Sequence, residues 1–457
     1  MFLASILVLA GCATFHPQPV SPEKSAAAFD SRSLADAGLR AFLETNHVAG
    51  DWPRQSWDLS ALTLAAFYYQ PALAEARAQW AAVEAAQITA GQRPNPTVGF
   101  TPTKDTTTTP PWIYGVTWDI PIETAGKRGK RIAEAEHLSE AARWNFVSAA
   151  WQTRSRVRAA LLGLYAARET EALLARQESA QSNVVRLLEG QYAAGAISDF
   201  EATQARIALE TTQLARQEAT GQRHQARVQL ASALGLPLRA LDDVRFSFAG
   251  LDQFPRDLTR PEVRRQAVLH RADVRGALAE YAASQSALQL EIARQYPDLH
   301  LGPGYELDQT DNKWSLGVTL DLPILNQNQG PVAEAKAKRA EAAAHFLTAQ
   351  TTAIGEIDGA LAGYNAMLQQ RATATALWND LQKRLNSVRA QAQAGEVDPL
   401  AVAGAEVEFN TGAQNRLDAL VKAQQALGQL EDAVQSPLTL PSATLDATEN
   451  NLSQSPK

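Results

Sequence analysis

The side chains most often used for catalysis and metal binding are few and scattered in this 457-residue chain. It contains one cysteine and seven histidines, and no two of these histidines are close in sequence. Metal sites need several such ligands at short, regular spacings. No aspartate or glutamate pairs with a histidine or serine at a recognisable catalytic spacing, and no phosphate-binding loop is present. We therefore predict that the protein is not an enzyme and holds no cofactor or metal, with His270 and His300 isolated at a surface or a wet interior.

The cysteine lies where covalent lipid attachment takes place. Residues 1–11 are apolar, are too short to span a bilayer and end in Leu-Ala-Gly directly before Cys12. This ending resembles the bacterial lipoprotein box, in which a peptidase cuts before the cysteine and the cysteine is acylated. No lysine or arginine precedes the apolar stretch, so a buried helix with a core cysteine is the alternative. We predict a signal peptide and a lipidated Cys12, carrying palmitate or a similar acyl chain.

Charge and hydropathy exclude two further classes of protein. Forty-two basic and 49 acidic residues give a net charge of −7, whereas nucleic-acid binding needs clustered positive charge. After the first dozen residues no uncharged apolar run of about 18 residues occurs, which excludes a bundle of membrane-spanning helices. We predict no nucleic-acid partner, and any contact with a bilayer must use another kind of element.

The chain is internally duplicated with an offset of about 200 residues. Residues 115–122 and 317–324 are identical at six of eight positions, and the Ala-Gly pair at 194–195 returns at 394–395. Each half reads as a helix, two short strands, a very long helix, a turn and another helix. We predict a signal peptide at 1–12, a tether at 13–56, repeats at 57–235 and 263–435, a connector at 236–262 and a disordered tail at 436–457.

The predicted strands alternate between apolar and polar residues. In residues 112–122 and 313–324 every second residue is aromatic or aliphatic, and the others are mostly glycine, threonine, serine and aspartate. A soluble sheet packed on a core would alternate in the same way. Strand lengths of about ten residues, aromatic residues near the strand starts and the export signal favour strands that cross a membrane. We predict that the polar residues face a water-filled lumen, with four as its main candidates: Thr117, Asp119, Thr319 and Asp321.

Four strands cannot close a barrel. An open sheet edge in hydrocarbon would leave amide and carbonyl groups unpaired at several kcal/mol each, so other copies must complete the sheet. Two, three or four copies would supply eight, twelve or sixteen strands, and the strand pattern does not choose among them.

Two helices of unusual length follow the strand pairs. Residues 128–193 and 331–394 have no internal proline and are rich in alanine, glutamate, glutamine and arginine. About 65 helical residues extend roughly 100 Å. Each helix ends at a glycine, Gly195 or Gly395, which suits a left-handed cap before a returning helix.

The sequence resembles the TolC-like outer-membrane efflux family over residues 55–435. The resemblance lies in the order of its features: a lipoprotein box, two duplicated halves, a strand pair in each half and helical hairpins that turn at a glycine. The resemblance implies a mainly α fold with a membrane β-barrel portion. In a homotrimer, four strands per chain would form a 12-stranded barrel, and long antiparallel hairpins would form an α-barrel tunnel in the periplasm. It also implies that the hairpin tips dock a periplasmic adaptor. The matching tip residues are Gly195, Ala196, Gly395 and Glu396, of which Ala196 and Glu396 replace the family's usual leucine.

The function implied is that of a passive exit duct in the cell outer membrane, which receives small solutes from an adaptor and a proton-driven inner-membrane pump. The basic run at residues 126–131 looks like a segment of heavy-metal efflux members. Basic residues at a helix start oppose the helix dipole, so we expect them to contact lipid phosphates or carboxylates such as Glu134 and Glu136. A solvated basic face is the alternative. The alternative function is a lipid-anchored periplasmic coiled-coil scaffold without a pore.

Overall fold

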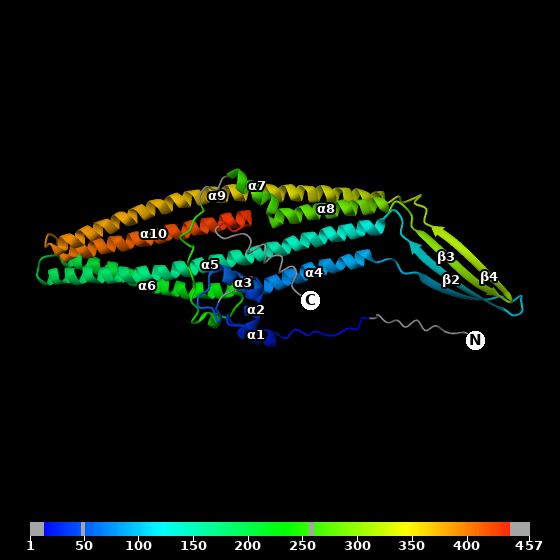
Figure 1. Cartoon of the computed structure of the whole chain (residues 1–457), viewed down its shortest axis with the longest axis horizontal. Coiled ribbons are helices and arrows are strands. Elements are labelled where there is room, and N and C mark those ends of the chain that lie inside the picture. Colours follow the sequence, from blue (N-terminus) through cyan, green and yellow to red (C-terminus); the bar gives the residue numbers. More distant parts are fainter. Residues whose placement is uncertain (1–12, 47–50, 256–259, 439–457) are drawn as a thin grey trace.

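Long helices run side by side from a small sheet at one end to two hairpin tips at the other (Figure 1). The computed structural model describes residues 13–46, 51–255 and 260–438. The predicted signal peptide, Cys12 and most of the predicted tail lie outside the described residues. The helices are α1 Pro22–Asp30, α2 Ala37–Thr45, α3 Leu59–Tyr69, α4 Pro71–Gly91, α5 Lys127–Ala193, α6 Asp199–Leu234, α7 Arg260–His270, α8 Ala272–Ala293, α9 Gln329–Gln393 and α10 Pro399–Val434, and the strands are β1 Thr97–Lys104, β2 Trp112–Ile122, β3 Leu299–Asp308 and β4 Asp311–Leu320.

The two predicted long helices are confirmed. α5 has 67 residues and α9 has 65, and the returning helices α6 and α10 have 36 residues each at an offset of 200. A capping box at Ser198 starts α6, and the Asp398 side chain accepts from the Ala401 N–H at 2.8 Å at the start of α10. None of the helices in the described part of the chain combines the length and apolarity needed to cross a bilayer.

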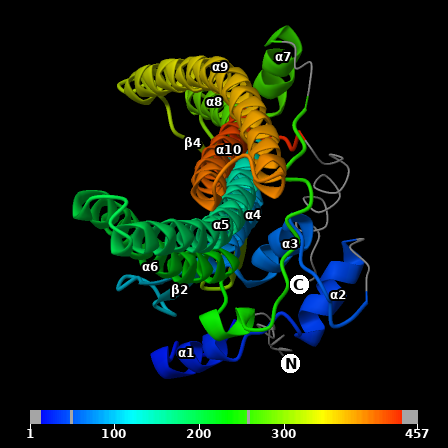
Figure 2. The same ribbon diagram turned by 90° about the vertical axis from the view of Figure 1, so that its left-hand side faces the viewer.

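Viewed end on, the four longest helices follow one another in the order α9, α10, α5 and α6 (Figure 2). α10 packs against both α9 and α5, whereas α6 packs along α5. The shorter helices α4 and α8 flank α5, and α8 also contacts α9. The second half of the chain therefore touches the first through both α8 and α10, while α6 and α9 form the two outer edges of this layer.

Residues 22–30 and 37–45 are helical, so the prediction of an extended tether over 13–56 was wrong for them. Asp36 caps α2, and Leu39 and Leu43, spaced by one helical turn, are buried in the same hydrophobic core as Leu62 of α3. The Arg32 guanidinium donates to two main-chain carbonyls far along the chain, Tyr69 O at 3.0 Å and Gly235 O at 2.8 Å. The stretch is rich in serine, proline and alanine, which suggested an extended chain. It nevertheless contains a short apolar helix face, Leu39 and Leu43, that is buried against the first repeat.

The two repeats are joined by a buried ionic network between α5 and α10. The Glu431 carboxylate, whose side chain has no exposed surface, lies 3.0 Å from Arg154 Nη2 and 3.4 Å from Arg158 Nε. Arg158 also donates to the Gln424 main-chain oxygen at 2.9 Å, and Gly428 leaves room for it, since a Cβ there would lie 2.1 Å from Arg158 Nη1. These contacts hold α10 at one axial position along α5.

Gly235 ends α6 in the left-handed conformation, with φ of +72°. A Cβ at this position would lie 3.0 Å from Tyr69 O and 3.1 Å from Tyr69 C, so alanine would meet both a strained backbone and a fixed main chain. We expect Gly235→Ala to lower the free energy of unfolding by about 1–3 kcal/mol, measured by denaturant unfolding in detergent. Gly190→Ala, inside α5 with open space around it, serves as the control and is expected to be neutral or slightly stabilising.

Candidate functional site: an amphipathic sheet and two helical tips

The four strands form one antiparallel sheet in the order β1-β2-β3-β4. β2 and β3 come from different repeats and pair in the centre, so the sheet itself joins the two halves. β1 and β4 each have a strand on one side only within the described residues. Both edges therefore offer unpaired main-chain groups.

The strand register brings three of the predicted lumen residues to one face. Asp119 and Thr117 lie on one face of β2, and Pro121 of that face lies opposite His300 on β3. Thr319 on β4 lies opposite His300 in turn. Because opposite residues of an antiparallel pair share a face, Thr117, Asp119 and Thr319 belong to the same polar surface. Asp321 does not lie on a strand: β4 ends at Leu320, before Pro323, which has no N–H to extend the ladder. The expectation that Asp321 is a strand residue was wrong.

The opposite face of the sheet is apolar and open. On β4, Trp314 is 81% exposed and Leu316 is 72% exposed. Aromatic rings form short ladders on this face, with centroids 4.8 Å apart for Tyr305 and Trp314 and 6.4 Å apart for Phe100 and Tyr114. A continuous exposed apolar surface of this kind indicates contact with lipid or another protein surface.

His300 has a partner on the polar face, so its interpretation as isolated was wrong. Its Nδ1 lies 2.9 Å from Oδ1 and 3.1 Å from Oδ2 of Asp119 on the neighbouring strand. The two residues are 181 positions apart, and only the pairing of β2 with β3 brings them together. Aligning the two repeats by their period-two faces would have placed both on the polar side.

At the junction of the sheet and α5, the basic run contacts protein groups other than those expected. Lys127 Nζ lies 2.7 Å from Asp298 Oδ1, and Arg131 forms an ion pair with Glu123. Arg128 Nε donates to the carbonyl of Gly91, the last residue of α4, at 2.6 Å. The basic side chains thus neutralise the free carbonyl end of α4, where positive charge is favourable. Two of the basic side chains are thus paired with carboxylates, as one of the expectations had it, but with Asp298 and Glu123 instead of Glu134 and Glu136.

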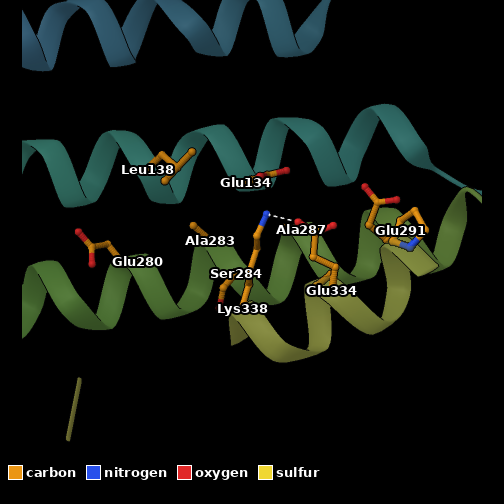
Figure 3. A pocket seen from close by; sticks show the side chains of 11 residues that line it. Glu134, Leu138, Glu280, Ala283, Ser284, Ala287, Glu291, Glu334 and Lys338 are labelled. Atoms are coloured by element: carbon orange, nitrogen blue, oxygen red, sulfur yellow. Dashed lines mark ion pairs between the residues drawn. The ribbon is translucent and has the colours of Figure 1, made fainter. Parts of the chain in front are cut away.

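An acidic groove lies beside this junction between α5, α8 and α9 (Figure 3). The groove has a volume of about 380 Å³. Lys338 Nζ lies 2.6 Å from a carboxylate oxygen of Glu334. Burial raises the pKa of Glu134; the positive charge of Arg294 lowers this pKa, and the negative charge of Glu291 raises it further. In the part of the chain that the structure describes, no three His, Cys, Asp or Glu side chains gather as metal ligands would.

The two hairpin tips share one main-chain conformation. Gly195 and Gly395 have φ values of +71° and +78°. The N–H of Ala196 donates to Gln191 O at 2.8 Å, and that of Glu396 donates to Gln391 O at 2.9 Å, which is the Schellman pattern. All four predicted tip residues are exposed, and both tips lie at the end of the molecule opposite the sheet (Figure 1).

The chain thus consists of an amphipathic sheet carried by long paired helices, with two exposed hairpin tips at the far end. The chain belongs to the outer membrane efflux protein family, whose sequence model matches residues 66–236 and 263–434. The family consists of efflux proteins and not of enzymes.

Two individual proteins are similar to this chain in sequence. The cobalt-zinc-cadmium resistance protein CzcC of Cupriavidus metallidurans is 29% identical over 214 residues, 46% of this chain and 50% of CzcC. The pyoverdine export outer membrane protein OpmQ of Pseudomonas aeruginosa is 29% identical over 177 residues, 37% of this chain and 36% of OpmQ. The chain thus matches about half or less of the length of these curated relatives.

Solved structures share the fold at low identity. CusC matches with a TM-score of 0.66 at 18% identity, covering 84% of this chain and 94% of CusC. VceC of Vibrio cholerae matches with a TM-score of 0.66 at 19% identity, covering 82% of this chain and 95% of VceC. The predicted family and its mainly helical architecture are thereby confirmed.

Proposed function

We propose that the chain is the outer-membrane exit duct of a tripartite efflux system. Three copies form a 12-stranded barrel continued by a periplasmic tunnel of helices, anchored to the membrane through a lipidated Cys12. Small solutes pass through passively after an adaptor and a proton-driven inner-membrane pump deliver them. Membership of the outer membrane efflux family supports this assignment.

The open sheet supports assembly with other copies. β1 and β4 expose their main-chain edges, and one face of the sheet is apolar. In hydrocarbon, each unpaired main-chain group would cost several kcal/mol, which pairing β4 of one copy with β1 of the next removes.

The observation that carries the proposal is that a helix contact made by one repeat has no equivalent made by the other within the chain. α10 of the second repeat packs on α5 of the first, and the matching contact would be α6 on α9. Within one chain that contact is not made, because α6 and α9 lie at opposite edges of the layer (Figure 2). A second copy placed head to tail supplies it, and repeating this contact by rotation closes a ring.

The surface of α6 fits this role. An apolar stripe on α6, consisting of Phe200, Ile207, Leu214 and Val228 at multiples of seven residues, is between 50% and 68% exposed. Seven-residue spacing is the pattern of a coiled-coil seam. The counterparts in α10 are Leu400, Val407, Gln414 and Gly428, all part-buried or buried within the chain. The α6 stripe thus has the composition of an interface without a partner inside the chain.

The hairpin tips are proposed to dock the adaptor. Their exposed Schellman turns present Ala196 and Glu396 at the end farthest from the sheet. We expect Glu396→Lys to reduce co-purification of the cognate adaptor several-fold, because a reversed charge at a contact costs affinity. Glu23→Lys, on the exposed surface of α1 away from the tips, is the control and is expected to leave adaptor recovery unchanged.

The cargo follows from the pump with which the duct works. CzcC is described as a cobalt-zinc-cadmium resistance protein and OpmQ as a pyoverdine export protein, so the two relatives differ in cargo. We therefore propose a conduit for small solutes, metal cations or organic molecules, delivered by the pump.

Planar bilayers test the duct against the alternative of a lipid-anchored scaffold. Purified protein is expected to insert as stable conducting units and to migrate as a trimer in native mass spectrometry from detergent. A duct requires both results. Protein that stays monomeric and dissolved without detergent, and that gives no conductance, would favour the scaffold.

A further inference from the structure

The polar face of the sheet carries few large side chains. Five glycines lie on this face by strand register and leave it with few large side chains near its centre: Gly99, Gly115, Gly302, Gly304 and Gly317. The ionisable groups that do project lie toward its two ends.

Near the helical end lies the Asp119–His300 pair. The side chain of His300 is 37% exposed and that of Asp119 is 49% exposed, so both reach water. An ionised carboxylate can only accept, so the 2.9 Å contact requires His300 Nδ1 to carry the hydrogen. Nε2 is then the ring atom that can take up or release a proton.

No other charged group lies opposite Asp119 or His300 on the neighbouring strands β1 and β4 to balance the charge of this pair. The residue opposite Asp119 on β1 is Thr97 and the residue opposite His300 on β4 is Thr319, neither of them charged. Toward the helices, Asp298 is paired with Lys127 and Glu123 with Arg131, while Asp321 is exposed beyond β4.

At the far end of the same face the charges are largely paired. Lys313 Nζ lies 2.6 Å from Asp308 and 3.6 Å from Glu306, and Asp311 is exposed at the turn. Of the groups on this face, the Asp119–His300 pair is therefore the one whose net charge follows the protonation of an imidazole.

We propose that Asp119 and His300 form a proton-controlled charge on the pore wall that sets the pore's preference for cations. The inference rests on the proposed function, because it requires the polar face to line a conducting pore. With His300 neutral, the pair carries the single negative charge of Asp119. When Nε2 takes a proton from the solvent, the pair becomes neutral while the Nδ1 hydrogen bond remains. Histidine is the side chain that makes this change between about pH 5 and 8.

Rings of carboxylates favour cations in channels. Three copies around one axis would place three such pairs at the same depth, and a narrow polar passage concentrates their field. The pore is therefore expected to prefer cations at about pH 7.5 and to lose part of this preference at about pH 5.5.

Reversal potentials across planar bilayers under a KCl gradient measure this preference. For the full-length protein we expect the permeability ratio of K⁺ to Cl⁻ to fall by about twofold or more between the two pH values. Asp119→Asn should lower the ratio at the higher pH. His300→Gln, which keeps a donor for Asp119, should retain the cation preference and abolish most of its pH dependence.

Thr101→Val, which lies opposite Gly115 on the same face of the sheet and away from the pair, is the matched control and should leave both the ratio and its pH dependence unchanged. An unaltered pH dependence in His300→Gln, or a preference for anions in the unmodified pore at the higher pH, would overturn the role of the pair while leaving the duct intact. A protein that gives no conductance would overturn the proposed function and this inference together.

Discussion

Replacing Ile207 and Leu214 together by aspartate is expected to leave the purified protein monomeric in detergent and without conductance. Both side chains belong to the α6 stripe and are more than half exposed in the single chain, at 57% and 67%. If the stripe packs on α9 of a neighbouring copy, each subunit contact loses about 3–6 kcal/mol of apolar burial. That loss corresponds to a weakening on the order of 10²–10⁴-fold.

Native mass spectrometry and conductance provide the readouts, and circular dichroism checks the fold. Because neither side chain is buried within the chain, helix content should match that of the unmodified protein. Gln222→Asp together with Gln229→Asp is the matched control, since it adds the same two negative charges to exposed positions of α6 that lie about 100° around the helix from the stripe. A double variant that still forms trimers with unchanged conductance would contradict the proposed arrangement of α6 and α9.

Removing the Glu431 side chain is expected to be the most damaging single change to the fold. Glu431→Ala would leave Arg154 and Arg158 buried without their shared carboxylate. Burial already lowers the pKa of Arg158, which the charge of Glu431 counteracts. Breaking a buried ion pair by removing one partner costs about 3–5 kcal/mol, because the remaining charge stays out of water.

Denaturant unfolding of the protein in detergent measures this loss. The double variant Arg154→Met with Glu431→Gln removes one buried charge from each side and keeps an acceptor for Arg158. It should therefore lose less stability than Glu431→Ala alone. A Glu431→Ala midpoint indistinguishable from that of a surface variant such as Glu218→Ala would show that the network adds nothing to stability.

The sequence predicted the elements because their signals are local. Alternation with a period of two marks β2 and its polar face, and absence of proline with abundant alanine marks α5 and α9. The glycines at 195 and 395 mark the two turns, since few other residues adopt a positive φ. The order of these elements, repeated in both halves, was sufficient to suggest the family.

Only the tertiary structure decided which of these faces meet. Periodicity tells which side of a strand is polar, but the pairing of β2 with β3 decides that Asp119 reaches His300. Likewise, α6 and α10 have the same length and equivalent places in the two repeats, yet α10 is covered by α5 while the α6 stripe stays exposed. The basic run at residues 126–131 has its partners at the end of α4 and at Asp298, directly before β3, instead of one turn along its own helix. Such contacts join residues tens to hundreds of positions apart, so they depend on the packing of whole helices and strands, which a local pattern does not encode.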